Sequence, residues 1–365
     1  MAVLTEEQSM LRDAAKSWVQ EKSPVTAFRK MRDSGVDIGY DAAAWNEMAE
    51  MGWAGVIIPE EYGGSSFGYL SMGLILEETG RTLTASPLIA SALAAASALI
   101  LGGSDAQKSA WLPKIAEGKA VAALAIDEGP HHAPDKVAAT VSGGKLSGKK
   151  VFVLEGMAAD VLIVSAKAGD AVELYLVKAD AAGVTRQKLS LADSRGAANI
   201  SFENVAVSDA DKLSGGAALL EKVLDRARAG VAAEMLGAAN QAFDVTLDYL
   251  KTRVQFGQVI GSFQALQHRA AKMFTELELS RSAVEAALTA IDNDAPDVPE
   301  LASLAKAKMG DTFHLVSNEM VQMHGGIGMT DAHDAGFYLK RARACEAAFG
   351  NQAFHRDRYA RIQGY

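Results

Sequence analysis

Apolar residues recur with two different periods along the chain, and the changes of period divide it into three stretches. In the first and last stretches apolar positions lie three or four residues apart, as on one face of an amphipathic helix. In the middle stretch the spacing is two, as on one face of a half-buried strand. The pattern predicts an α+β protein with an N-terminal helical domain (1–118), a middle β domain (119–212) and a C-terminal helical bundle (213–365).

Local signals position several elements within these stretches. Thr5, followed by Glu6 and Glu7, is suited to cap the first helix, and Gly52 is suited to end a later one. Residues 142–146 (SGGKL) have the composition of a hairpin turn. Strands are predicted at 161–164, 172–177 and 198–205. Long helices are predicted at about 221–252, 263–291 and 299–323, and their short connections favour an antiparallel bundle.

Composition narrows the class of protein. The chain has 365 residues, of which 49% are hydrophobic, so it can bury a large core. A net charge of −9 without a basic tract argues against nucleic acid as a partner. The single Cys345 excludes an internal disulfide and fits a reducing compartment. The first residues lack the features of a signal peptide, and residues 86–101 are too short and too weakly apolar to span a bilayer, so we expect a cytoplasmic protein.

One segment between two predicted helices has the chemistry of a phosphate site. Residues 253–268 (RVQFGQVIGSFQALQH) combine Arg253, an aromatic residue followed by Gly257, and several glutamines. Arginine presents a rigid fork of donors that suits phosphate oxygens. By contrast, His131 and His132 have no third ligand at a suitable spacing, so we expect them to be solvent-exposed and predict no metal site.

The order of motifs over almost the whole chain resembles the acyl-CoA dehydrogenase family. The matching segments are residues 45–64 (WNEMAEMGWAGVIIPEEYGG), 107–126, 253–268, and the Gly325–Gly328 turn that follows residues 321–324 (VQMH). The resemblance implies a middle β-barrel or sandwich and a C-terminal four-helix bundle. It also implies an FAD-dependent oxidation of an acyl-CoA thioester to the enoyl-CoA, with a carboxylate as the base.

The resemblance assigns the phosphate and adenine end of the FAD site to residues in the C-terminal bundle. In the family, the matching residues reach the flavin of a neighbouring subunit. Here they are Arg253, Phe256, Gln264, Gln322, Gly325 and Gly326. The alternatives are that Arg253 caps the end of a helix and that Gly325–Gly328 is an ordinary interhelical turn.

The flavin-ring end departs from the family pattern. The family's loop of small and hydroxyl-bearing residues is replaced by residues 127–135 (DEGPHHAPD). A family hydroxyl that contacts the flavin is replaced by Leu154, which cannot donate a hydrogen bond. We therefore expect this half of the flavin site to be eroded.

The catalytic base is also missing from both positions that the family uses. Gly350 occupies the usual Glu position, and Ala227 occupies the position used by a minority of members. Glu346 and Glu234 are candidate substitutes, with a surface or ion-paired role as the alternative for both.

Two residues of the predicted bundle match family positions on the substrate side. Asp225 and Arg228 match residues that contact the pantetheine and line the acyl cavity. The alternative is that residues 225–228 (DRAR) form only a charged helix start, with the acid placed as the helix dipole favours.

Three hypotheses follow. In the first, the chain is the base-lacking subunit of a heteromeric acyl-CoA dehydrogenase and binds an FAD whose ring and base lie in a sister subunit; this resembles the two-gene enzymes of bacterial steroid side-chain degradation, in which one partner lacks an active site. In the second, it is a self-sufficient homo-oligomer with a relocated base such as Glu346. In the third, it is a non-catalytic acyl-CoA-binding or scaffold protein. For the enzyme, family resemblance implies an electron-transfer flavoprotein as the electron acceptor.

Overall fold

The structure is a computed structural model that describes residues 4–365. Residues 1–3, which belong to the segment predicted to lack the features of a signal peptide, lie outside the described part. The chain divides into two compact units. We call residues 1–28, 73–84 and 228–365 the helical unit, and residues 29–72 and 85–227 the sheet unit. These units do not follow the three predicted domains, whose boundaries stay a prediction.

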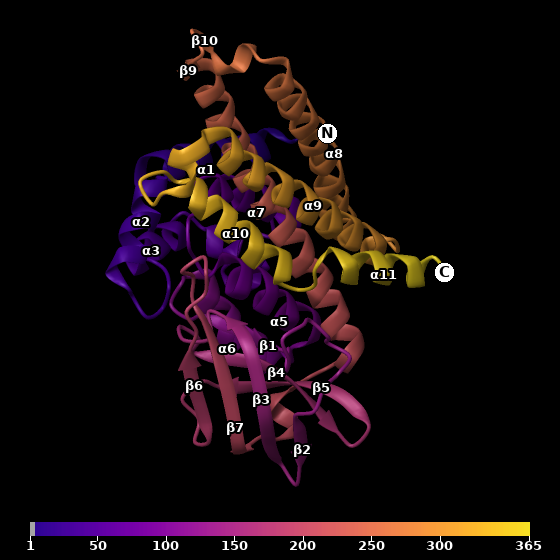
Figure 1. Ribbon diagram of the computed structural model, residues 1–365. Helices are drawn as coiled ribbons and strands as arrows, with labels where there is room; N and C mark the ends of the chain where they lie inside the picture. Colours follow the sequence, from indigo (N-terminus) through magenta and orange to yellow (C-terminus); the bar gives the residue numbers. More distant parts are fainter. Residues whose placement is uncertain (1–3) are drawn as a thin grey trace. The chain divides into compact units, whose positions relative to one another are not determined.

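Helices come first, strands second and helices last, which confirms the predicted fold class (Figure 1). The first helices are α1 (Glu6–Lys22), α2 (Val25–Ser34), α3 (Ala42–Glu50), α4 (Gly68–Arg81), the π-helix η3 (Leu88–Ala95), α5 (Ala96–Gly102) and α6 (Asp105–Ala116). The main strands are β1 (Ala122–Ala125), β2 (Thr140–Ser142), β3 (Lys145–Leu154), β4 (Val161–Ala168), β5 (Ala171–Lys178), β6 (Val184–Lys188), β7 (Ala197–Ala206) and β8 (Lys212–Leu213). The last helices are α7 (Gly216–Thr252), α8 (Gln264–Asp292), α9 (Val298–His324), α10 (Ala335–Ala347) and α11 (Gln352–Ile362).

The strands of the sheet unit form one mixed sheet. Its order is β6-β7-β3-β2-β4-β5-β8, and β1 pairs with β4 in parallel. The predicted hairpin turn is confirmed, because Ser142 pairs with Lys145 across β2 and β3. The three predicted strands correspond to β4, β5 and β7. Side chains from alternating positions, among them Leu162, Val164 and Ile200, form a buried cluster that holds the sheet together.

The last helices agree with the predicted ranges, except that α7 is longer and begins in the sheet unit. α7 runs for 37 residues and begins at Gly216 rather than near residue 221 (Figure 1). Thr5 caps α1 with a capping box, as predicted. α8 and α9 pack side by side, and α10 and α11 pack against α9.

Glycines let α4 and α7 approach each other closely within the helical unit. A Cβ added at Gly237 of α7 would overlap the backbone carbonyl of Glu77, and one added at Gly80 of α4 would overlap that of Glu234. Only residues without a side chain allow two helix backbones to come this near. The crossing also places Glu77 where it pairs with Arg281 of α8, at 3.0 Å.

We expect Gly237→Ala to destabilise the chain. The added methyl group meets rigid backbone, so the helices must separate, and overpacking of this kind lowers the free energy of unfolding by about 1–3 kcal/mol. The matched control is Gly336→Ala on α10, where an added Cβ meets nothing within 4 Å. Thermal unfolding followed by circular dichroism measures both variants. Equal melting temperatures for the two would contradict the close crossing.

Candidate functional site

The predicted phosphate-binding segment forms a short hairpin after α7. The Arg253 N–H donates to the carbonyl of Tyr249 at 2.9 Å, so the chain leaves the helix directly after its last turn. Strands β9 (Val254–Gln255) and β10 (Gln258–Val259) pair through a two-residue turn of Phe256 and Gly257. We call residues 253–259 the Arg253 hairpin (Figure 1). All of its side chains are exposed, so Arg253 points into solvent at the end of the unit.

Phe256 is held in an arrangement that a free-standing chain does not favour. Its φ is +54° and that of Gly257 is +79°, as a two-residue hairpin turn with two left-handed residues requires. A bulky residue with positive φ is a steric outlier. Its ring is 92% exposed and has an edge-on contact with Phe263, with centroids 6.1 Å apart. The hairpin therefore presents an exposed aromatic ring at its turn.

The Gly325–Gly326 turn offers open backbone. α9 ends at His324, and Gly325 adopts φ +61° and ψ −138°, a combination suited to glycine. A Cβ added at Gly325 or Gly326 would meet nothing within 4 Å. Gln322, one turn earlier on α9, is exposed. The space in front of this turn is free for a ligand to approach the main chain.

One contact brings the two segments to the same end of the helical unit. The Tyr249 hydroxyl donates to the His324 carbonyl at 3.4 Å, and the two rings lie 4.3 Å apart. Tyr249 precedes Arg253 by one turn, and His324 directly precedes Gly325. Gln264 begins α8, after the 3-10 turn η5 (Ile260–Ser262) that follows the hairpin, and it is exposed. We call these three segments, with the six side chains and glycines predicted for FAD, the cofactor edge.

The predicted base position is a left-handed turn clamped by buried donors. Phe349 has φ +55° and Gly350 has φ +105°. The Phe349 carbonyl accepts hydrogen bonds from Arg228 Nε at 3.3 Å and His355 Nε2 at 3.1 Å. Lys306 Nζ donates to the Gly350 carbonyl at 2.9 Å. The three donor residues are at most 1% exposed, so this turn is fixed from inside the bundle.

Burial sets the protonation of this cluster. It lowers the pKa of Lys306 to about 8, because the ammonium is removed from water. Burial, and after it the charge of Arg228, lowers the pKa of His355 far below its ordinary value. His355 is therefore neutral and donates its Nε2–H to the Phe349 carbonyl. The site holds donors and cations where the family places a proton acceptor.

Side chains fill the space at Gly350. A Cβ added there would overlap the rings of Phe354 and His355. The guanidinium of Arg228 lies over the Phe354 ring, 5.5 Å from its centroid. At the position where most family members carry Glu, this chain therefore has no carboxylate, and neighbouring side chains occupy the space that one would need.

The candidate substitute carboxylates are ion-paired. Glu234 is 2% exposed and makes a bidentate pair with Arg341, at 2.9 and 2.7 Å. Glu346 accepts from Arg343 at 2.6 Å and lies 3.1 Å from His314 Nδ1. Each carboxylate would have to leave its cationic partner before it could reach a substrate proton, so this geometry does not favour either residue as the base.

The substrate-side residues are buried and lie in different units. Asp225 and Arg226 belong to the sheet unit, and Arg228 belongs to the helical unit. All three are at most 9% exposed, and α7 begins nine residues before Asp225. The alternative that residues 225–228 form only a charged helix start is therefore wrong. Arg226 lies over the Tyr69 ring at 5.2 Å.

The loop that replaces the family's flavin-ring loop satisfies its own polar groups. Asp127 accepts from the Ala133 N–H at 3.2 Å and pairs with His132 at 3.0 Å. Glu128 pairs at 2.7 Å with Lys150, whose side chain is fully buried. His131 is exposed as expected, but the same expectation for His132 is wrong, because its side chain is 2% exposed against Asp127. Within residues 4–365, no group of three potential ligands is placed to hold a metal ion.

Sequence reasoning missed an exposed aromatic residue, Phe152, beside this loop. The pairing of β3 with β7 shifts register between Lys150 and Val153, and Phe152 within this bulge has φ +52° and is 51% exposed. Its N–H donates to Asn199 Oδ1 at 3.3 Å. Leu154, two residues later, is half-buried. The exposure results from the bulge, which turns Phe152 out of the regular strand pairing and which the sequence pattern does not reveal.

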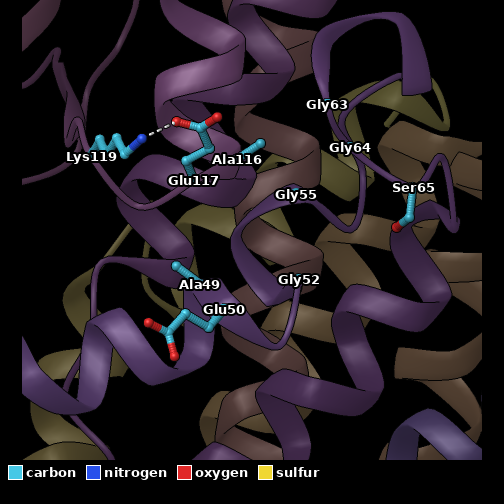
Figure 2. A pocket seen from close by; sticks show the side chains of 10 residues that line it. All are labelled: Ala49, Glu50, Gly52, Gly55, Gly63, Gly64, Ser65, Ala116, Glu117 and Lys119. Carbon is cyan, nitrogen blue, oxygen red and sulfur yellow. Dashed lines mark ion pairs between the residues drawn. The ribbon is translucent and has the colours of Figure 1, made fainter.

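A shallow hollow of about 390 Å³ lies elsewhere in the sheet unit (Figure 2). Its lining residues are Ala49, Glu50, Gly52, Gly55, Gly63, Gly64, Ser65, Ala116, Glu117 and Lys119. The N–H groups of residues 63–65 already donate to carbonyls of residues 55–60. Lys119 pairs with Glu117 at 2.8 Å. The donors that line the hollow are engaged with one another, so it provides no free set for an anionic ligand.

We expect that restoring a carboxylate with Gly350→Glu destabilises the chain. The new side chain meets the Phe354 and His355 rings, and φ at this position is strained for any L residue, so a loss of at least about 2 kcal/mol is expected. Ala347→Glu, on the exposed side of α10, is a control with the same added charge. Chemical denaturation compares the two. A Gly350→Glu variant as stable as the control would show that the position is open.

Comparison with known proteins agrees with this architecture. The chain matches "Acyl-CoA dehydrogenase, N-terminal domain" over residues 5–119 and "Acyl-CoA dehydrogenase, C-terminal domain" over residues 214–363. It is 31% identical to acyl-CoA dehydrogenase IpdE2 of Mycobacterium tuberculosis, over 92% of this chain and 91% of that protein. Among solved structures, a variant of the Tcur3481-Tcur3483 steroid acyl-CoA dehydrogenase superposes with a TM-score of 0.90 at 29% identity, covering 98% of both chains. The ChsE4-ChsE5 complex of M. tuberculosis gives a TM-score of 0.93 at 24% identity over the full length of both chains. The chain belongs to the acyl-CoA dehydrogenase family, a family of flavoprotein oxidoreductases.

Proposed function

We propose that this chain is the base-lacking subunit of a heteromeric acyl-CoA dehydrogenase. The observation that carries the proposal is the contrast between two sites in the helical unit. The position of the base is closed around Gly350, whereas the residues predicted for FAD at the cofactor edge are exposed in the described part of the chain, residues 4–365. In this proposal the sister subunit supplies the base and the flavin-ring pocket, and this chain supplies the edge that holds the other end of the cofactor.

The absence of a base is the first argument. Gly350 cannot accept a proton, and Ala227 is a fully buried methyl group. The groups that surround Gly350 are Arg228, Lys306 and a neutral His355 that donates its ring proton. These groups donate hydrogen bonds to carbonyl oxygens, and none of them is a carboxylate that could take a proton from the substrate.

The fit of the cofactor edge to a dinucleotide is the second argument. When bound, FAD would supply the hydride-accepting chemistry of the reaction. Arg253 would pair with the pyrophosphate, and the bare backbone at Gly325 and Gly326 would approach it closely. The exposed Phe256 ring would pack on the flat part of the ligand, with Gln264 and Gln322 as hydrogen-bond donors beside it.

The exposed apolar side chains near this edge indicate a protein partner. Besides Phe256, the exposed large hydrophobic residues in these segments include Val254, Val259, Ile327 and Met329. Apolar residues gathered at one end of a unit are typical of an interaction surface. Similarity to the Tcur3481-Tcur3483 enzyme supports a two-chain assembly of the steroid type. An electron-transfer flavoprotein as acceptor and a cytoplasmic location stay predictions from the sequence.

The geometry disfavours the two alternatives. A relocated base at Glu346 would first have to leave Arg343 and His314, and its side chain is only 15% exposed. In a scaffold that binds no flavin, the strained and exposed Phe256 would have no ligand to contact.

Flavin absorbance tests the proposal directly. We expect the purified single chain to retain little FAD and to show no dehydrogenase activity, and co-expression with the sister subunit to give a yellow, active complex with fewer than one FAD per chain. In that complex, Arg253→Gln should weaken FAD binding by about 10- to 100-fold, because a charge-assisted hydrogen bond is lost. Arg12→Gln, an exposed position on α1, is the control. Full flavin occupancy and turnover by the pure chain, abolished by Glu346→Gln, would instead establish the relocated-base alternative.

Phe256→Gly should affect stability and cofactor binding in opposite directions. Glycine adopts the left-handed turn without strain, so the melting temperature of the single chain should stay the same or rise. In the complex, the loss of the ring should increase FAD dissociation. We would measure melting by calorimetry and dissociation by the recovery of flavin fluorescence. A variant that loses stability but keeps FAD would show that the ring packs within this chain.

A further inference from the structure

Three aromatic rings stack where the two halves of the cofactor edge join. His324 lies with its ring centroid 4.3 Å from that of Tyr249 and 4.3 Å from that of His333. Tyr249 comes from α7, His324 is the last residue of α9, and His333 lies in the connection to α10. An added Cβ at Gly328 would meet the Val321 carbonyl oxygen and the Cβ of His324, so the turn after α9 folds back against the end of that helix.

A continuous path of contacts runs through this stack. The Arg253 N–H donates to the Tyr249 carbonyl, and the Tyr249 hydroxyl donates to the His324 carbonyl. His324 is bonded to Gly325, where the open backbone begins. The position of the Arg253 hairpin relative to the glycine turn therefore depends on how Tyr249 and His324 fit together.

The hydrogen bonds of His324 define its protonation state. Its Nδ1–H donates to the Met320 carbonyl at 2.7 Å, and the buried Nε2 has no hydrogen-bond partner. His324 is only 3% exposed. A second proton on Nε2 would therefore be a buried donor with no acceptor, which is strongly unfavourable.

We propose that His324 is a positioning residue that, in its neutral form, joins the Arg253 hairpin and the Gly325–Gly326 turn into one dinucleotide-binding edge. This inference rests on the proposed function, because it assigns a role within the same site. It differs from a general contribution to folding, since it requires the two segments to loosen together when the ring is removed or protonated.

The expected pH dependence follows from the surroundings of the ring. Burial lowers the pKa of His324 in the folded chain; the hydrogen bond to the Met320 carbonyl opposes this shift, and the neighbouring His333 adds to it. Its other neighbours, Tyr249 from α7 and the backbone of Gly328, bring no carboxylate to offset this. When the segment opens, the His324 ring is exposed to water and takes up a proton near pH 6.5. The contact between the Arg253 hairpin and the glycine turn is therefore fully stable above about pH 6.5 and weakens as the pH falls below it.

Amide hydrogen exchange of the single chain tests the coupling without any cofactor. In His324→Ala, residues 253–259 and 325–329 should both exchange faster, by about fivefold or more, because local opening becomes easier. His324→Phe keeps an aromatic ring and should keep the protection. Tyr249→Leu removes the ring from the other helix and should loosen both segments in the same way. It tests the same contact if the His324→Ala variant does not fold. His131→Ala, an exposed histidine in the sheet unit, is the control.

The pH profile separates positioning from a merely structural role. Below pH 6.5 the wild-type chain should exchange progressively faster in both segments than His324→Phe, whereas at pH 8 the two should agree. In the co-expressed complex, FAD retention should follow the same order of variants. Unchanged exchange in the Arg253 hairpin of His324→Ala, or an identical pH profile for His324→Phe and wild type, would overturn the inference. If the exchange results hold but the complex binds no FAD, the proposed function fails and the coupling stands.

Discussion

The left-handed turn at Phe349–Gly350 is the constraint on which the function of this chain depends. Its two carbonyls accept hydrogen bonds from Arg228, His355 and Lys306, all buried in the bundle. Removing one donor would leave a buried carbonyl unsatisfied, which typically costs about 1–3 kcal/mol. The turn is therefore part of the core, and it fixes a backbone geometry that admits only glycine without strain. Because the stable form of this turn requires glycine at position 350, a carboxylate cannot be placed there without strain.

The opposite situation holds at the cofactor edge. The Arg253 hairpin buries none of its side chains, and the turn that follows α9 leaves open space in front of its glycines. These segments contribute little to the core, so their geometry must be maintained by a few specific contacts, of which the Tyr249–His324 pair is one. Segments with few buried contacts open easily, and binding of a ligand or partner then stabilises them by mass action.

The sequence predicted the order of helices and strands well, because the hydrophobic period changes clearly at both transitions and the capping residue Thr5 is local. It placed the hairpin turn at residues 142–146 for the same reason. It could not place His132 against Asp127, the start of α7 at Gly216, or the rings that fill the space at Gly350. Each of these results from tertiary packing, in which burial decides the environment of a polar side chain and leaves no periodic trace in the chain.

The distribution of satisfied and unsatisfied groups distinguishes what this chain does for itself from what it does for a partner. Where the family's ring pocket and base would be, polar groups are paired internally, as in Glu128 with Lys150 and Lys306 with the Gly350 carbonyl. At the cofactor edge, Phe256 is strained and exposed, and His324 has a buried acceptor without a donor. Strained backbone conformations persist only where the surrounding structure holds them, and they are often found at functional sites. The strained, exposed ring of Phe256 next to Arg253, and the buried acceptor of His324 next to the Gly325–Gly326 turn, are the physical reasons for the proposal that this edge binds a flavin held mainly by another chain.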